Sequence, residues 1–266
     1  MNILASALLL LLLTAQQGPA FAEEGGGGPR EWRHVEAYRY QAVPRGHEKD
    51  TEQIRVDLSF DQERIGLAST ALSDRGSEHI VLQLTGEGDL VSGERSFYSK
   101  SGELTEEKVW RDGYRVFIER TSGTRKKTMA MNVPEGLVPA VESSMLVRLR
   151  RFPYRSTDSW KLLMFNFRGK SAPAVARQNG VERITVPAGQ FDCYRVEVIF
   201  HVFFFHPQVV CWLAEKNPHV LVRSLGKRSL FGPTYDTRLV GTDHGARAGR
   251  GHADVPMVGR MKEDGK

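Results

Sequence analysis

The sequence predicts an all-β domain with one or two short helices and an antiparallel sheet. Apolar residues alternate with polar ones, as in Ile54, Val56 and Leu58, which gives a strand one buried and one solvated face. Such runs recur roughly every eight to twelve residues between turn residues, which is typical of antiparallel all-β domains. Asp112-Gly113 joins two of the runs and favours a type I′ hairpin turn, because both of its central positions need positive φ.

The first strand follows from the alternation over 54–60, and the Asp112-Gly113 turn gives the pair 109–111 and 114–118. Leu137 to Arg151 breaks the rhythm, because its apolar residues recur at helical spacing and Pro153 follows, so we expect the main helix there. The other runs predict strands over 79–85, 95–99, 125–132, 159–167, 181–186, 191–205, 208–215, 219–225 and 234–242.

The 266 residues divide into four parts by composition. Residues 1–22 read as a signal peptide cleaved after Ala22, because an apolar run too short to span a membrane precedes Ala20-Phe21-Ala22. Residues 23–30 form a Gly-rich, flexible lead-in, 31–242 a single β domain and 243–266 a polar, disordered tail. The mature chain is therefore expected in the periplasm, without a transmembrane span.

Composition and motifs exclude several classes of function. Two cysteines rule out a disulfide scaffold and a four-thiolate zinc site, and a net charge of +5 is too low for a dedicated nucleic-acid binder. The sequence has no nucleophile elbow, H-E-x-x-H, C-x-x-C or P-loop, and its eight histidines are scattered, so we expect neither a cofactor nor a metal. Basic clusters read as solvated surface or as contacts to anionic headgroups or peptidoglycan carboxylates; they lie at Arg125/Lys126/Lys127, Arg148/Arg150/Arg151/Arg155 and Arg223/Lys227/Arg228.

Cys193 and Cys211 lie in two apolar runs that we expect to pair as antiparallel strands. A hairpin centred on residue 202 would place the two cysteines opposite each other and allow a disulfide in an oxidising compartment. A turn centred on His206-Pro207 would instead place Cys193 opposite residue 220 and leave two free buried thiols. Both alternatives, and a redox role, stay open at this level.

The most apolar mature segment runs from Val198 to Phe205, and neither of its faces alternates with charge. It is either a strand buried on both sides or an exposed hydrophobic tip that touches lipid or an acyl chain. The candidate ligand-binding residues are Phe200, Phe203, Phe204, Phe205 and Trp212.

Residues 181–197, VERITVPAGQFDCYRVE, resemble an uncharacterised bacterial family of exported proteins that carry a domain of unknown function. The segments 131–154 and 211–226 are similar to further parts of that family. Within the motif, Pro187 fixes φ for the first turn position and Gly189 supplies a left-handed residue, so both read as structural turn residues. The resemblance implies an open, curved antiparallel sheet, or half barrel, akin to the carriers that sort lipoproteins.

These observations predict a non-catalytic periplasmic protein that binds a lipid, acyl chain or other hydrophobic ligand in a β groove, in a cell-envelope role. One alternative is an envelope scaffold that binds protein partners through a sheet edge. The other is a hydrolase or carbohydrate-processing enzyme, which would need convergent carboxylates or a Ser/His pair in one cleft, such as Asp158 or Asp192 near His219.

Overall fold

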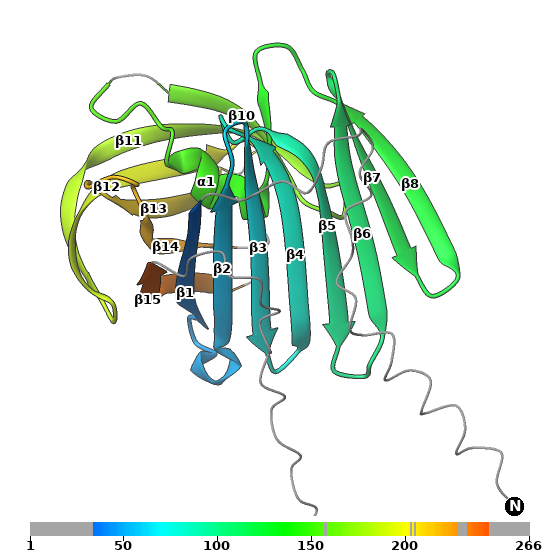
Figure 1. The fold of residues 1–266 in the computed structure, drawn as a ribbon, viewed down its shortest axis with the longest axis horizontal. Helices are drawn as coiled ribbons and strands as arrows, with labels where there is room; N and C mark the ends of the chain where they lie inside the picture. Colours follow the sequence, from blue (N-terminus) through cyan, green and yellow to red (C-terminus); the bar gives the residue numbers. More distant parts are fainter. Residues whose placement is uncertain (1–33, 157–158, 203, 205, 228–232, 245–266) are drawn as a thin grey trace, which may run out of the picture. The chain divides into compact units, whose positions relative to one another are not determined.

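A computed structural model describes residues 34–156, 159–202, 204, 206–227 and 233–244. These residues form one curved, unclosed sheet of 15 strands in the order β8-β7-β6-β5-β4-β3-β2-β1-β15-β14-β13-β12-β11-β10-β9 (Figure 1). Neighbouring strands are antiparallel, except that β9 and β10 run parallel. The predicted all-β, antiparallel, open fold is confirmed. The expected signal peptide, lead-in and most of the tail lie outside the described residues.

The strands alternate with short turns, as the sequence pattern predicts. Their bounds are β1 His34–Pro44, β2 Glu52–Phe60, β3 Arg64–Ser73, β4 Gly76–Thr85, β5 Leu90–Ser99, β6 Leu104–Asp112, β7 Arg115–Ser122, β8 Arg125–Asn132, β9 Val138–Val141, β10 Ser159–Phe165, β11 Ser171–Val186, β12 Gly189–Phe200, β13 Gln208–Ala214, β14 Leu221–Lys227 and β15 Thr234–His244. Two 3-10 helices, Glu48–Asp50 and Glu142–Ser144, and one α-helix, α1 Met145–Leu149, complete the described elements.

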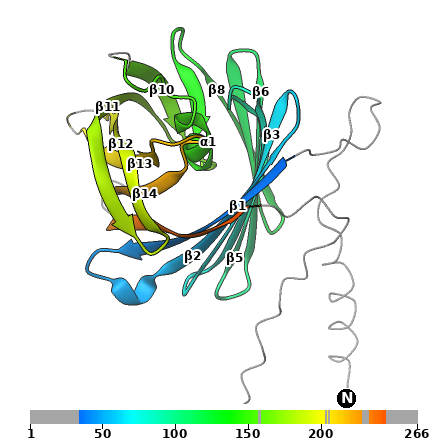
Figure 2. The same ribbon diagram turned by 60° about the vertical axis from the view of Figure 1, so that its left-hand side comes forward.

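The expected helix over 137–151 is wrong in most of its length. Val138–Val141 instead form β9, which pairs with Leu162–Phe165 of β10, and only Met145–Leu149 are α-helical. The backbone hydrogen bonds of a parallel ladder thus replace helical ones in the first four residues. Figure 2 shows α1 on the inner side of the curved sheet, so this segment packs on the concave side.

The apolar side chains pack in two clusters. The larger one contains the inward-facing residues of β1–β8, among them Tyr38, Leu58 and Leu82, which are each 0% exposed. The smaller one joins β10–β13 to α1 and the residues after it, through Leu149 and Phe152. The apolar residues that alternate with polar ones in the sequence therefore form the core, and α1 covers the core over one half of the sheet.

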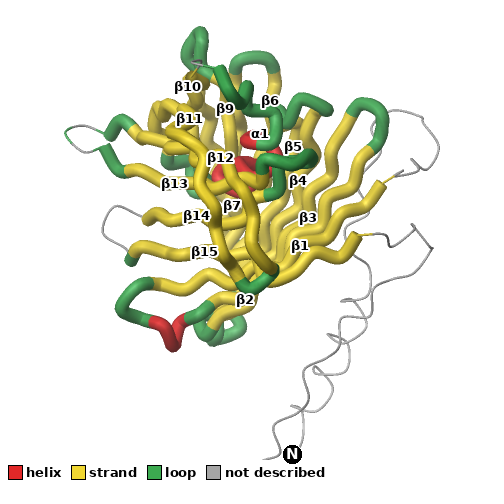
Figure 3. Tube along the Cα trace, turned by 90° about the vertical axis from the view of Figure 1, so that its left-hand side faces the viewer, coloured by secondary structure: helices red, strands yellow, loops and turns green. Residues whose placement is uncertain are grey.

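The longest hairpin, β11–β12, bends across its neighbours. Val186 pairs with Gly189, whose φ of +130° suits glycine, so the turn lies at Pro187-Ala188. The Ala188 N–H donates to the Leu239 carbonyl of β15 over 3.2 Å, and Figure 3 shows the hairpin crossing in front of β13–β15. The turn motif therefore fastens this hairpin to the body of the sheet.

Buried carboxylates link neighbouring strands through arginines. Glu107 of β6 is 1% exposed and accepts a 2.5 Å hydrogen bond from Nη1 of Arg95, while Nε of Arg120 lies 3.5 Å from its other oxygen. Asp236 of β15 is 5% exposed and accepts two 2.8 Å bonds from Arg223 of β14. A third bond of 2.7 Å comes from Arg238. Charge-assisted bonds of this kind fix the pairing of adjacent strands.

Candidate functional site

Two regions carry side chains that the packing of the sheet does not by itself explain. The first is a buried cluster on the concave side, where α1 ends. Arg150 donates from Nη1 to Oε2 of Glu36 over 2.6 Å, and both side chains are 8% exposed. The Tyr38 hydroxyl donates to the same oxygen over 2.5 Å, and the Arg150 guanidinium lies 5.1 Å from the Tyr38 ring centroid. The last residues of the α1 segment are thereby held against β1.

A second arginine of the segment holds it against the β4–β5 turn. Arg148, whose side chain is 9% exposed, forms an ion pair with Asp89, and its guanidinium lies 5.4 Å from the Trp160 ring centroid. The expectation that this basic cluster is solvated surface is therefore wrong for Arg148 and Arg150. The cause is tertiary, because Glu36 and Asp89 come from distant strands and supply the countercharges.

Burial also changes the acid–base properties of the tyrosines beside Arg150. Removal from water raises the pKa of Tyr38 and of Tyr40 well above the ordinary tyrosine value, although the positive charge of Arg150 opposes this. The pKa of Arg150 is raised as well, because Tyr38 and Glu36 outweigh the effect of burial. All three groups therefore keep their usual protonation state at neutral pH.

The second region is the tip of the β12–β13 hairpin. Strand β12 spans Gly189–Phe200, so the strand expected over 191–205 ends earlier than predicted. The Phe200 N–H donates to the Pro207 carbonyl over 2.9 Å and closes a loop from which Phe204 projects, 94% exposed. The rings of His201 and His206 lie 5.2 Å apart at the base of this loop. Of the two expected alternatives for this apolar run, the exposed tip applies to Phe204 and the buried strand applies to Val198.

Basic residues lie in loops at the same end of the strands as this tip. The pairing of Ala174 with Phe200 places the β10–β11 turn, with Arg168 and Lys170, at the same end of the strands as the tip. The pairing of Val209 with Gly226 likewise brings the end of β14, with Lys227, to that end. The β1–β2 connection, 45–51, also lies there and is neutral in formal charge. Aromatic and basic side chains therefore share one end of this half of the sheet.

Of the predicted ligand-binding residues that the structure describes, Phe200 and Trp212 lie on opposite faces of the sheet. Phe200 packs against the smaller apolar cluster, which contains Leu149 and Phe152. Trp212 is buried on the opposite face of the sheet, where its indole N–H donates to Glu182 over 2.9 Å. Trp212 pairs with Arg195, an odd number of residues from Phe200, so the two side chains must point to opposite faces. Phe203 and Phe205 lie outside the described residues.

Cys193 and Cys211 are two free, buried thiols. Cys193 pairs with Ala214 and Cys211 with Val196, so neither of the two expected registers is observed. Ala214 and Cys211 are three residues apart on one strand, which places the cysteines on opposite faces of the sheet. Burial raises the pKa of each thiol to about 12.

The residues required by the hydrolase alternative are engaged elsewhere. Asp192 is exposed and pairs with Arg183, whose Nε lies 2.7 Å from its Oδ1. That arginine lowers the pKa of the Asp192 carboxyl through a hydrogen bond. The His219 ring lies tilted against Tyr154 and edge-on to Tyr194, and its Nδ1 is hydrogen-bonded to the Ala214 carbonyl over 2.9 Å. Asp158 lies outside the described residues.

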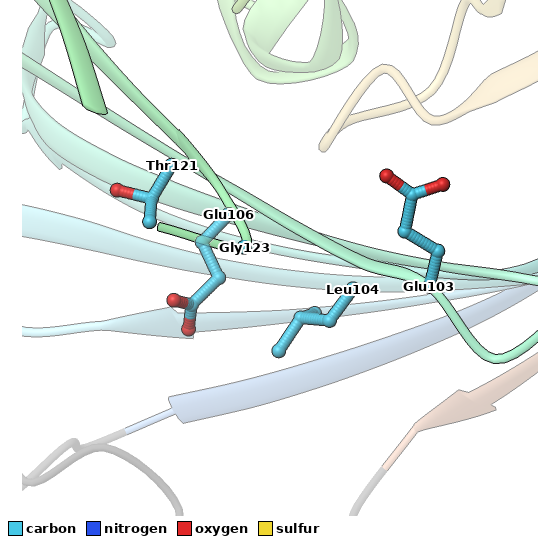
Figure 4. A pocket seen from close by; sticks show the side chains of 5 residues that line it. All are labelled: Glu103, Leu104, Glu106, Thr121 and Gly123. Atoms are coloured by element: carbon cyan, nitrogen blue, oxygen red, sulfur yellow. The ribbon is translucent and has the colours of Figure 1, made fainter. Parts of the chain in front are cut away.

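Other features of the described residues offer little for chemistry. A pocket of about 250 Å³ lies at one end of β6 and β7, lined by Glu103, Leu104, Glu106, Thr121 and Gly123 (Figure 4). No three His, Cys, Asp or Glu side chains in the described ranges gather closely enough to hold a metal ion. In the same ranges, no helix has both the length and the apolar character to cross a membrane.

Comparison with solved structures gives eight matches, among them three distant ones. No family model and no curated protein matches the chain. A DUF1089 family protein from Pseudomonas aeruginosa is 9% identical with a TM-score of 0.36, covering 74% of this chain and 92% of its own. A predicted lipoprotein from Parabacteroides distasonis is 11% identical with a TM-score of 0.31, and the match covers 80% of this chain and 96% of that protein. A predicted exported protein with a YmcC-like fold from Bacteroides fragilis is 13% identical with a TM-score of 0.28, and the match covers 80% of this chain and 96% of that protein.

Proposed function

We propose that this chain is a non-catalytic protein of the cell envelope that binds lipid, and that the β12–β13 tip makes the contact from the periplasmic side. The observation that carries the proposal is Phe204, a phenylalanine 94% exposed at the end of a hairpin. A phenylalanine ring with this exposure contributes almost no buried apolar area to the stability of the fold. Phe203 and Phe205 flank it in the sequence, so positions 203–205 hold three consecutive aromatic residues.

The energetics suit reversible contact with a bilayer. Transfer of one phenylalanine side chain from water into an apolar phase contributes about 1.5–3 kcal/mol. Each Lys or Arg close to an anionic surface adds about 1 kcal/mol, and Arg168, Lys170 and Lys227 lie at the same end of the strands. A few kcal/mol from the tip and a few from the basic residues give binding that depends on both anionic lipid and the aromatic tip.

The test is co-sedimentation of the chain with vesicles that contain phosphatidylglycerol. Phe204→Asp should lower the bound fraction at least about tenfold, because a carboxylate replaces the inserted ring and repels the anionic surface. Tyr114→Asp is the matched control, since Tyr114 is also an aromatic residue at a hairpin tip, 74% exposed, at the other end of the strands. That variant should bind as the wild type does.

Two results would contradict the proposal. One is the absence of wild-type binding to anionic vesicles at low salt. The other is equal loss of binding in both variants, which would mean that the added negative charge and not the position of the ring matters. Circular dichroism of Phe204→Asp should match the wild type, because the side chain makes no buried contact.

A further inference from the structure

We propose that the buried end of α1 contains a second binding site, for a carboxylate, formed by Arg150 and Tyr40. Nη1 of Arg150 is bonded to Glu36, but its Nε and Nη2 are buried without a hydrogen-bond partner. The hydroxyl of Tyr40, a residue only 3% exposed, is buried and unpartnered as well. The site goes beyond the proposed contact with a membrane, because it lies on the concave side and not at the tip.

The three unpartnered atoms match one class of ligand. Nε and Nη2 form the side edge of a guanidinium, which donates two parallel hydrogen bonds to the two oxygens of a carboxylate. The Tyr40 hydroxyl stays protonated at neutral pH, because burial raises its pKa, so it can donate a third bond. A buried donor left without a partner is costly, and a bound carboxylate would relieve that cost for all three.

The charge around the site also favours an anion. Two guanidinium groups, of Arg148 and Arg111, face the single carboxylate of Asp89, whereas Arg150 faces Glu36. The surplus positive charge therefore lies beside Asp89, next to Arg148 of the same segment. Nε of Arg148 is also buried without a partner, so the excess of donors extends along the α1 segment.

Access to the site depends on the α1 segment. The unpartnered atoms are covered by protein in the structure, and α1 has only five residues. Arg148 and Arg150 attach this segment to the β4–β5 turn and to β1 through ion pairs. A ligand would enter when the segment moves away from the sheet, and it would be enclosed when the ion pairs form again.

The experiment is isothermal titration of the intact chain with acetate, decanoate and inorganic phosphate. We expect saturable binding of a carboxylate. Decanoate should bind more tightly than acetate if the natural ligand is a fatty acid, and the two affinities should be equal if the natural ligand is a small metabolite. Arg150→Lys keeps the positive charge that faces Glu36 but removes the two donors Nε and Nη2. It should weaken carboxylate binding about tenfold or more. Tyr40→Phe removes one donor and should weaken binding about five- to tenfold, and it creates no new unpaired group in the fold.

Arg183→Lys, which changes the exposed pair with Asp192, is the control and should bind as the wild type does. Phe204→Asp should also keep full carboxylate affinity, so loss of vesicle binding and loss of carboxylate binding can be separated. The proposal is overturned if the wild type shows no saturable heat with either carboxylate, or if phosphate binds more tightly than both. It is equally overturned if Tyr40→Phe and Arg150→Lys bind as tightly as the wild type; Tyr40→Phe alone decides if Arg150→Lys does not fold.

Discussion

Replacement of Glu107 by alanine should destabilise the fold strongly, although no part of the side chain reaches a proposed site. Glu107 is 1% exposed and lies between two arginines from neighbouring strands, Arg95 of β5 and Arg120 of β7. Its alanine variant removes the acceptor of the 2.5 Å bond from Arg95 and the partner 3.5 Å from Arg120. The two guanidinium groups would then face each other across an empty position.

The expected cost lies at the lower end of the range for a broken buried ion pair. Removal of one partner of such a pair costs about 3–5 kcal/mol. Arg95 keeps its 2.5 Å bond to Glu78, and the Arg120 side chain is 42% exposed and stays partly hydrated. We therefore expect a loss of about 3 kcal/mol, which corresponds to a fall in Tm of about 6–12 °C for a domain of this size.

Urea unfolding followed by tryptophan fluorescence measures this free energy. Glu106→Ala is the matched control, because Glu106 is the adjacent residue on the same strand but faces solvent. It should change stability by less than about 0.5 kcal/mol. A loss of less than 1 kcal/mol for Glu107→Ala, or equal losses for both variants, would refute the view that this row of charges holds β5, β6 and β7 in register.

Three further predictions concern the core, the thiols and the dependence on pH. Gly93→Ala should cost about 1–3 kcal/mol in urea unfolding, because the new Cβ would lie 2.4 Å from Cδ2 of Leu82; a neutral result would show that the strands can part there. Cys193 and Cys211, with thiol pKa values raised by burial to about 12, should not react with a thiol reagent at pH 8 in the native state. Denaturation without reductant should then release two thiols, and their absence would reveal a disulfide. Burial alone would raise the pKa of Asp236, but its arginine partners outweigh burial and lower it. Its stabilising effect is thus complete above the ordinary aspartate pKa of about 3.9 and is lost as the pH falls through the lower native value. Asp236→Asn should therefore be less stable than the wild type at pH 7, with a difference that shrinks in acid; a constant difference would contradict the pKa shift.

The sequence predicted the sheet because the signals for strands and turns are local. The alternation in Ile54, Val56 and Leu58 places these residues on the inner face of β2, as the core cluster shows. A hairpin turn joins β6 to β7 as expected, and Gly113 has a positive φ of +53°. The centre of this turn is Gly113-Tyr114 because Asp112 pairs with Arg115, and Asp112 has no positive φ, so the expected type I′ turn centred on Asp112-Gly113 is wrong by one residue. Side-chain alternation and turn conformation need no knowledge of distant residues.

The helical spacing over 137–151 misled because a parallel partner strand competes with a helix for the same backbone groups. The basic cluster near Arg150 misled for a related reason. A string of arginines reads as solvated surface unless the carboxylates that neutralise it are known, and here they come from residues more than fifty positions away. The apolar run from Val198 combined a buried strand with an exposed tip, and only the end of β12 at Phe200 separates them.

The sequence alone determined that this chain forms an antiparallel sheet, where most of its turns lie, and that Phe203–Phe205 form an unusual aromatic run. The tertiary structure decided that Cys193 and Cys211 face opposite sides, that Arg150 is buried against β1, and that the basic loops share an end with the tip. The physical reason is register. Register shifts interrupt the pairing of β1 with β15, of β11 with β12, of β13 with β14 and of β4 with β5, and each shift changes which side chains share a face. No local pattern specifies where those irregularities fall, because they satisfy the packing of the whole curved sheet.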